Sequence, residues 1–258
     1  MGRNIVGIVL TCALAWGQAP VPSAQSPSEP GQSAPIRVEV NEVIVPVTVT
    51  DDKGRFVSNL DKPDFKVFED GKEQNIKFFT RERNQPVVVG FILDMSNAIR
   101  LHWEKYKEAS LELVWNLLPG DKRFSGFLVT SSTEAEIAVK TSNDSEKIVE
   151  KIRKLKPGGG SALNDAIYLA CTRTDLVKGE PIEPRRVLIV IGDGNDNSSK
   201  HTLDQVIEIA QRSLVTVYAV STSAFGFQSV GAANLERLAS ETGGRVEYPL
   251  EGVYKDVE

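Results

Sequence analysis

The hydrophobic pattern of this chain changes its period at residue 86. From residue 86 to 93 the side chains are apolar almost without interruption and rich in valine, and the run ends in Asp94, Met95 and Ser96. An apolar run of this kind is typical of a central strand in a parallel sheet that helices cover on both faces. In such sheets, ligands bind beyond the carboxyl ends of the strands. Asp94 and Ser96 are therefore expected at a ligand-binding edge.

After residue 86, strand-like and helix-like segments alternate. Helices are expected at residues 99–118, 145–155, 203–212 and 232–240, with another starting at Ser161. Further strands are expected at residues 123–129, 135–139 (an edge strand), 186–191, 215–220 and 245–248. This order predicts an α/β fold: a doubly wound, mostly parallel open sheet with helices on both faces, Rossmann-like in architecture. We assign residues 86–250 to this domain.

Upstream of residue 86, apolar residues occur at every second position, which indicates strands. The predicted strands cover residues 36–40, 43–49, 64–68 and 76–79, with turns at 51–54 and at Asp70-Gly71. The Asp-Gly pair is a strong signal for a two-residue hairpin. Residues 36–82 are thus expected to form a small antiparallel β module. Because so small a module is marginally stable alone, we expect it to pack on the larger domain.

The two ends of the chain are not expected to join the fold. Residues 1–19 resemble a secretory signal peptide, with cleavage after Ala19 or Ala24, although an uncleaved anchor is the alternative. Residues 20–35 form a Pro/Ser-rich segment that predicts a disordered linker. The protein is then exported, to the periplasm or the extracellular space, with no stable membrane span after cleavage. Residues 251–258 look like the truncated start of a C-terminal helix, or the end of a fragment.

Composition excludes several classes of function. The 35 acidic and 30 basic residues leave no basic excess for a phosphate backbone, so nucleic acid is not an expected partner. The two histidines, His102 and His201, lie outside the loops at the strand ends, which argues against zinc and against a His-based catalytic triad. Cys171 falls in an apolar helical pattern and is expected to be a core residue.

Three segments at strand ends or helix starts bring polar groups to the predicted edge: residues 94–98, 159–161 and 192–197. They supply two carboxylates and two hydroxyls, from Asp94, Asp193, Ser96 and Ser161. Hard oxygen ligands without His or Cys suit Mg²⁺, Ca²⁺ or Mn²⁺. The sequence therefore indicates a divalent-cation site.

With these residues in place, the chain from about residue 38 to 250 resembles the von Willebrand factor type A (VWA) domain, in particular the bacterial VWFA-related group in which a short β segment precedes the domain. The metal-ion-dependent adhesion site of that family reads Asp-x-Ser-x-Ser, then a Thr, then an Asp. Asp94, Ser96 and Asp193 match it, Ser161 substitutes for the Thr, and Ala98 departs from it.

The resemblance implies a non-catalytic binding or adhesion protein. It implies that Ser96 and Ser161 bind a cation directly, most simply Mg²⁺, while Asp94 and Asp193 hold metal-bound waters. An acidic residue of a protein or peptide partner would complete the coordination. Because Ala98 removes one hydroxyl, two outcomes stay open: a weakened site in which water replaces that ligand, or a decayed site on a structural scaffold.

Two other interpretations of the same residues are weaker. Asp193, Asn195 and Asn197 have the spacing of EF-hand ligands, but the sixth and twelfth positions of that loop do not match, so we treat the spacing as coincidence. A Mg²⁺-dependent phosphatase-like hydrolase could use Asp94 as nucleophile and Asp193 as metal ligand. It would need a second aspartate two residues after the nucleophile, where this chain has Ser96. We therefore predict that the protein is not an enzyme.

Overall fold

The computed structural model describes residues 43–45, 47, 49, 51, 57–81, 85–173, 175–177, 184–222 and 230–248. The chain divides into two compact units, residues 1–44 and 45–258. All the helices and strands described below belong to the second unit. The predicted signal peptide, the linker, the strand at 36–40 and the helix start at 251–258 lie outside the described residues.

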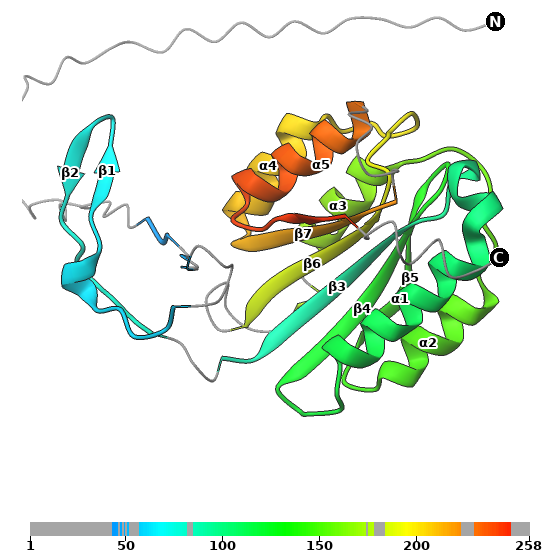
Figure 1. Ribbon diagram of the computed structural model, residues 1–258, viewed down its shortest axis with the longest axis horizontal. Helices are drawn as coiled ribbons and strands as arrows, with labels where there is room; N and C mark the ends of the chain where they lie inside the picture. The colour runs from blue at the N-terminus through cyan, green and yellow to red at the C-terminus, as the bar shows by residue number, and fades with distance from the viewer. Residues whose placement is uncertain are drawn as a thin grey trace, which may run out of the picture. The chain divides into compact units, whose positions relative to one another are not determined.

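A six-stranded sheet with the order β5-β4-β3-β6-β7-β8 forms the core of the α/β domain (Figure 1). The apolar run that begins near residue 87 forms β3, in the middle of the sheet and parallel to both neighbours. The strands are β3 (Val87–Asp94), β4 (Phe124–Ser131), β5 (Ala135–Ser142), β6 (Arg185–Gly192), β7 (Val215–Ser221) and β8 (Val246–Glu247). Only β5 is antiparallel among these strands, and it lies at one edge as predicted.

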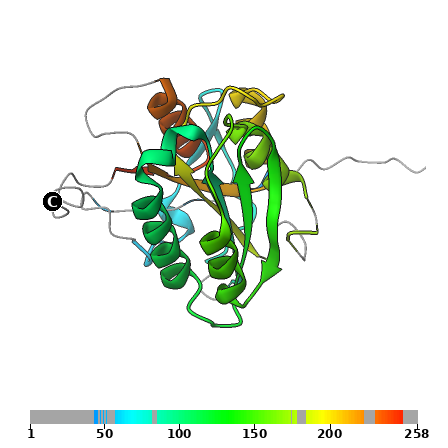
Figure 2. The same cartoon turned by 90° about the vertical axis from the view of Figure 1, so that its right-hand side faces the viewer.

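Helices cover both faces of the sheet, as Figures 1 and 2 show. One face carries α1 (Trp103–Leu117) and α2 (Ser145–Lys154), and the other carries α3 (Leu163–Thr172), α4 (Leu203–Arg212) and α5 (Val230–Glu241). Side chains alternate along β3, so that Ile92 packs in the core beneath α3–α5 and Leu93 packs beneath α1 and α2. This arrangement confirms the predicted doubly wound α/β fold.

Most predicted elements of this domain are present, with small shifts at their ends. The helix expected at 99–118 starts as a 3₁₀ helix, η2 (Asn97–His102), before α1 begins. The helix expected from Ser161 begins two residues later, and α4 has the predicted bounds. Thr202 and Gln205 form a capping box that fixes the start of α4. Cys171 is buried, as predicted, and burial raises the pKa of its thiol to about 12.

The upstream residues match their prediction only in part. A hairpin forms at the predicted Asp70-Gly71 turn, where φ is 49° and 75°, but its strands are β1 (Val67–Glu69) and β2 (Lys72–Gln74) and not 64–68 and 76–79. The prediction of a strand at residues 76–79 is wrong, because these residues are not in a strand. Continuing the register of β1 and β2 would pair it with the segment around η1 (Lys62–Asp64). This segment is a 3₁₀ helix and contains Pro63, which has no N–H to donate to a ladder.

The described positions within 43–49 are also not in a strand. The exposed fractions of Val43, Val45 and Val47 are 82%, 55% and 60%, so these side chains find no core to pack against. The backbone N–H of Val57 donates to the carbonyl of Val49 (2.9 Å), across the predicted 51–54 turn.

Candidate metal site

The parallel strands β3, β4 and β6 end at the same edge of the sheet, at Asp94, Ser131 and Gly192. Asp94 is fully buried. Its Oδ1 accepts a hydrogen bond from the backbone N–H of Ser96 (2.8 Å), while its Oδ2 has no hydrogen-bond partner among the described residues. Ser96 is itself buried and is the N-cap residue of η2. The first predicted loop therefore holds one carboxylate oxygen and leaves the other unpaired.

Burial raises the pKa of Asp94 from its ordinary value of 3.8 to about 6. Hydrogen bonds from Ser96 lower it in part, and the negative charges of Asp193 and Asp196 raise it further. The carboxylate form of Asp94 is thus less stable in the metal-free protein than that of an exposed aspartate. A cation at this edge would offset both the burial and the repulsion between the carboxylates.

The second predicted loop lies against the first through backbone hydrogen bonds. The N–H of Asn97 donates to the carbonyl of Gly159 (3.1 Å), and the N–H of Gly158 donates to the carbonyl of Met95 (2.7 Å). Ser161 follows directly and has an exposed fraction of 3%. Its hydroxyl, like Asp94 Oδ2, has no hydrogen-bond partner among the described residues.

The third predicted loop starts directly after β6. A Cβ at Gly192 would lie 2.8 Å from the Cβ of Asp94, so this close approach requires glycine. Asp193 is half-buried, and its two oxygens accept from the backbone N–H and the side-chain amide of Asn195 (2.9 and 2.8 Å). All four predicted metal ligands therefore lie on adjacent loops at one edge of the sheet. Both carboxylate oxygens of Asp193 have hydrogen-bond partners, whereas Oδ2 of Asp94 has none among the described residues.

A bridge that the sequence analysis missed joins the second and third loops. Asn197 Oδ1 accepts from the backbone N–H of Ser161 (2.9 Å), and the N–H of Asn197 donates back to the Ser161 carbonyl (3.0 Å). The side chain of Asn197 also accepts from Ser198 Oγ (2.8 Å). The Asp-x-Asn-x-Asn spacing thus has a structural use: its last member positions Ser161.

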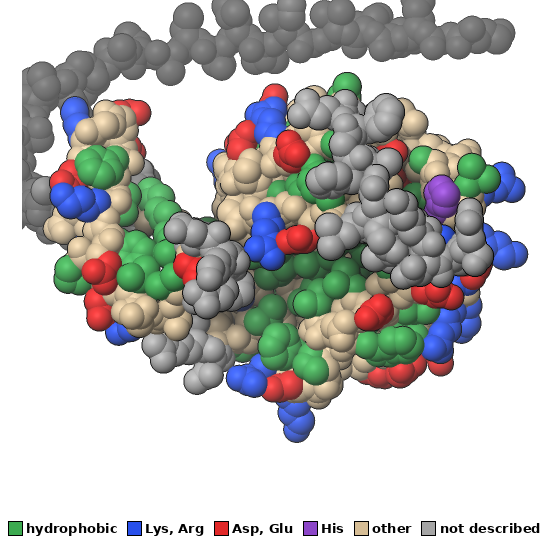
Figure 3. All heavy atoms as spheres, in the orientation of Figure 1, with side chains coloured by type: hydrophobic (Ala, Val, Ile, Leu, Met, Phe, Trp, Pro, Cys, Tyr) green, Lys and Arg blue, Asp and Glu red, His purple; other side chains and the backbone are tan. Residues whose placement is uncertain are grey.

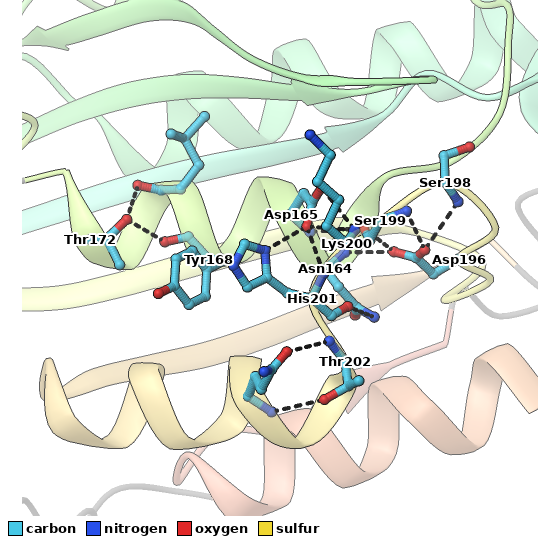
Figure 4. Close-up of polar contacts among 12 residues, drawn as sticks. Asn164, Asp165, Tyr168, Thr172, Asp196, Ser198, Ser199, Lys200, His201 and Thr202 are labelled. Atoms are coloured by element: carbon cyan, nitrogen blue, oxygen red, sulfur yellow. Dashed lines mark hydrogen bonds and ion pairs between the residues drawn. The ribbon is translucent and has the colours of Figure 1, made fainter.

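A polar cluster beyond this bridge fixes the loop before α4 to the start of α3 (Figure 4). His201 Nδ1 lies 2.7 Å from Asp165 Oδ1, and the His201 ring stacks on Tyr168 with 3.7 Å between centroids. Asp196 accepts from the backbone N–H of Asn164 (2.7 Å). Although burial alone would raise the pKa of Asp165, hydrogen bonds from His201 and nearby amides lower it. His201 therefore helps to hold the loop between β6 and α4 against the start of α3.

The oxygen atoms of these side chains suit a hard cation and do not suit a soft one. In the part of the chain that the structure describes, no three His, Cys, Asp or Glu side chains come together as metal ligands. A cation here would depend on hydroxyl oxygens beside the carboxylates, which suits Mg²⁺, Mn²⁺ or Ca²⁺. Ala98 is exposed on η2 and supplies no oxygen.

On the face shown in Figure 3, basic and acidic side chains are interspersed. Among the described residues, no helix has the length and apolar character needed to cross a membrane.

Comparison of folds places the domain among known structures. It is similar to an aerotolerance-related membrane protein from Bacteroides fragilis (16% identity, TM-score 0.52, covering 66% of this chain and 96% of that one). It is also similar to the vWF domain of the type V pili tip protein Mfa5 from Porphyromonas gingivalis (13% identity, TM-score 0.52, covering 68% and 95%). A von Willebrand factor type A protein from Catenulispora acidiphila has 16% identity and a TM-score of 0.52, covering 66% and 40%. At these identities the likeness shows the fold alone.

Sequence comparison identifies the family. No curated protein matches the chain. The sequence model of the von Willebrand factor type A domain matches residues 89–251, which is more than half of the chain and includes β3 almost entirely. The chain therefore belongs to the von Willebrand factor type A domain family.

Proposed function

We propose that this protein is an exported, non-catalytic binding protein that engages a protein or peptide partner through a divalent cation at the carboxyl edge of its sheet. Domains of this family generally serve as adhesion or scaffold modules rather than as catalysts. Mg²⁺ is the expected ion, with Mn²⁺ and Ca²⁺ as alternatives. Export is supported by the predicted signal peptide and by similar structures that include a pili tip protein and a membrane protein.

The observation that carries the proposal is a pair of buried oxygens without hydrogen-bond partners, Asp94 Oδ2 and Ser161 Oγ. Leaving a buried polar group unpaired costs about 1–3 kcal/mol, so two at one edge call for a ligand. Ser96 and Ser161 would bind the cation directly, and Asp94 and Asp193 would hold its waters. When bound, the cation supplies a positive charge that an acidic group of the partner can coordinate.

Metal titration tests this proposal. Isothermal titration of the wild-type protein with Mg²⁺, Mn²⁺ and Ca²⁺ should show one weak site, which Asp94→Ala abolishes. Ala98→Ser should tighten binding because it restores a hydroxyl to the site. Absence of binding in the wild type, with binding in Ala98→Ser, would instead mean that the site has decayed and that any partner uses another surface.

A phosphatase assay separates binding from catalysis. Mg²⁺-dependent hydrolysis of p-nitrophenyl phosphate that is lost in Asp94→Asn would contradict a non-catalytic role. We expect no turnover above the buffer rate, since Ser96 stands where the proton-transferring aspartate of such hydrolases would be needed.

A further inference from the structure

A third buried oxygen without a partner lies at the same edge, on Ser131. In the described part of the chain, the buried side-chain oxygens that lack a hydrogen-bond partner are Asp94 Oδ2, Ser131 Oγ and Ser161 Oγ. All three belong to residues at the carboxyl ends of β3 and β4 or in the loop just before α3. Ser131 is fully buried, so it has no access to bulk solvent that would pair its hydroxyl. The clustering of three such oxygens points to one shared ligand.

The register of the sheet places the Ser131 side chain on the same face as that of Asp94. The two residues are direct partners in the parallel ladder between β3 and β4. On each strand, the residue two positions earlier, Ile92 and Val129, packs in the core beneath α3–α5. Because side chains repeat with a period of two along a strand, Asp94 and Ser131 also point to the face that α3 covers.

Backbone hydrogen bonds connect Ser131 to both predicted metal loops. The N–H of Met95 donates to the Ser131 carbonyl (2.6 Å), and the N–H of Ala162 donates to the Ser132 carbonyl (2.7 Å). The end of β4 therefore lies between the loop that carries Asp94 and the loop that carries Ser161. No residue of this kind was expected from the sequence, because Ser131 stands outside the Asp-x-Ser-x-Ser pattern.

We propose that Ser131 contributes a hydroxyl ligand to the cation site and thereby replaces the one that Ala98 cannot supply. The inference rests on the proposed function, since it assumes that the edge binds a divalent cation. It also accounts for the departure at Ala98, because the site keeps three hydroxyl oxygens from Ser96, Ser131 and Ser161. The hydroxyl is a hard, neutral oxygen donor and adds no charge to the two carboxylates.

The first test compares metal affinity across serine variants. In isothermal titration with Mg²⁺ and Mn²⁺, Ser131→Ala should bind at least about tenfold more weakly than wild type, the lower end of what loss of a supporting residue costs a metal site. Ser110→Ala is the matched control. Ser110 is equally buried but lies on α1, where its hydroxyl donates to the Tyr106 carbonyl (2.7 Å). This control should bind as wild type does. Ala98→Ser added to Ser131→Ala should restore affinity.

The second test changes the ligand atom. Ser131→Cys places a soft sulfur in the site, so affinity for Cd²⁺ should rise relative to Mg²⁺. The ratio of the two affinities should increase at least about tenfold over wild type, and Ser110→Cys should leave it unchanged. A side chain that served only to pack the strand would not alter metal preference. This variant also keeps the test decisive if Ser131→Ala does not fold.

The outcomes separate the two proposals. If wild type binds metal and both Ser131 variants match it in affinity and in Cd²⁺ preference, the role of Ser131 is wrong and the proposed function stands. If wild type binds no divalent cation, both are overturned.

Discussion

Asp94 offers a prediction in which the effect of one substitution on stability depends on both pH and bound metal. In the folded, metal-free protein the pKa of Asp94 is about 6, against an ordinary value of 3.8. Folding therefore favours the protonated carboxyl. Well below pH 3.8 the group is protonated in both the folded and the unfolded chain and imposes no penalty. Between about pH 3.8 and 6 the carboxyl ionises in the unfolded chain but stays protonated in the folded protein, so stability falls as the pH rises; above about pH 6 the loss is complete, at about 3 kcal/mol.

Asp94→Asn removes this penalty because an amide does not ionise, while its oxygen can still accept from Ser96. In EDTA, the free energy of unfolding of the variant should equal that of wild type near pH 3 and exceed it by up to about 3 kcal/mol near pH 8. Urea unfolding followed by circular dichroism measures both. Ser161→Ala, a neutral change at the same edge, should show a difference from wild type that does not vary with pH.

Adding Mg²⁺ at about one hundred times its dissociation constant should nearly cancel this difference at pH 8. Wild type should gain about 2.7 kcal/mol and Asp94→Asn nothing, because the variant lacks the charge that holds the cation. A stability difference in EDTA that stayed constant from pH 4 to pH 8 would refute the claim that burial of the Asp94 charge costs free energy.

Three further variants test the fold and the support of the edge. Gly194→Ala should lower the free energy of unfolding by more than about 2 kcal/mol, because φ is +76° and the new Cβ would lie 2.1 Å from a backbone carbonyl of α5; Gly158→Ala, with open space around it, should change it by less than about 0.5 kcal/mol in the same urea titration. Asp165→Asn should lower the free energy of unfolding by about 1–2 kcal/mol and speed amide hydrogen exchange across residues 196–202, since it loses the charge-assisted contact with His201. Unchanged exchange would contradict the inference that Asp165 fixes this loop to α3. Phe127→Ala, at an exposed fraction of 1%, should cost about 3–5 kcal/mol by urea unfolding, and a loss under 1 kcal/mol would mean that the core is not packed as described.

The sequence by itself determined the features that depend on local pattern. The nearly continuous apolar run identified β3 as the central strand, and the hydrophobic period predicted the observed bounds of α4. The Asp70-Gly71 pair identified the hairpin because few other residues adopt positive φ at both turn positions. The positions of Asp94, Ser96, Ser161 and Asp193 at predicted strand ends and helix starts also indicated one shared edge, since the carboxyl ends of parallel strands meet there.

The tertiary structure alone decided which other side chains join that edge. Asn197 reaches Ser161 across 36 residues of chain, and Asp165 meets His201 across the same separation. Ser131 faces the site only because β4 pairs with β3 in a register that sets it beside Asp94. In the sequence it is one polar residue among several at a strand end. Contacts of this kind depend on how strands and loops pack against each other, and no local propensity encodes that.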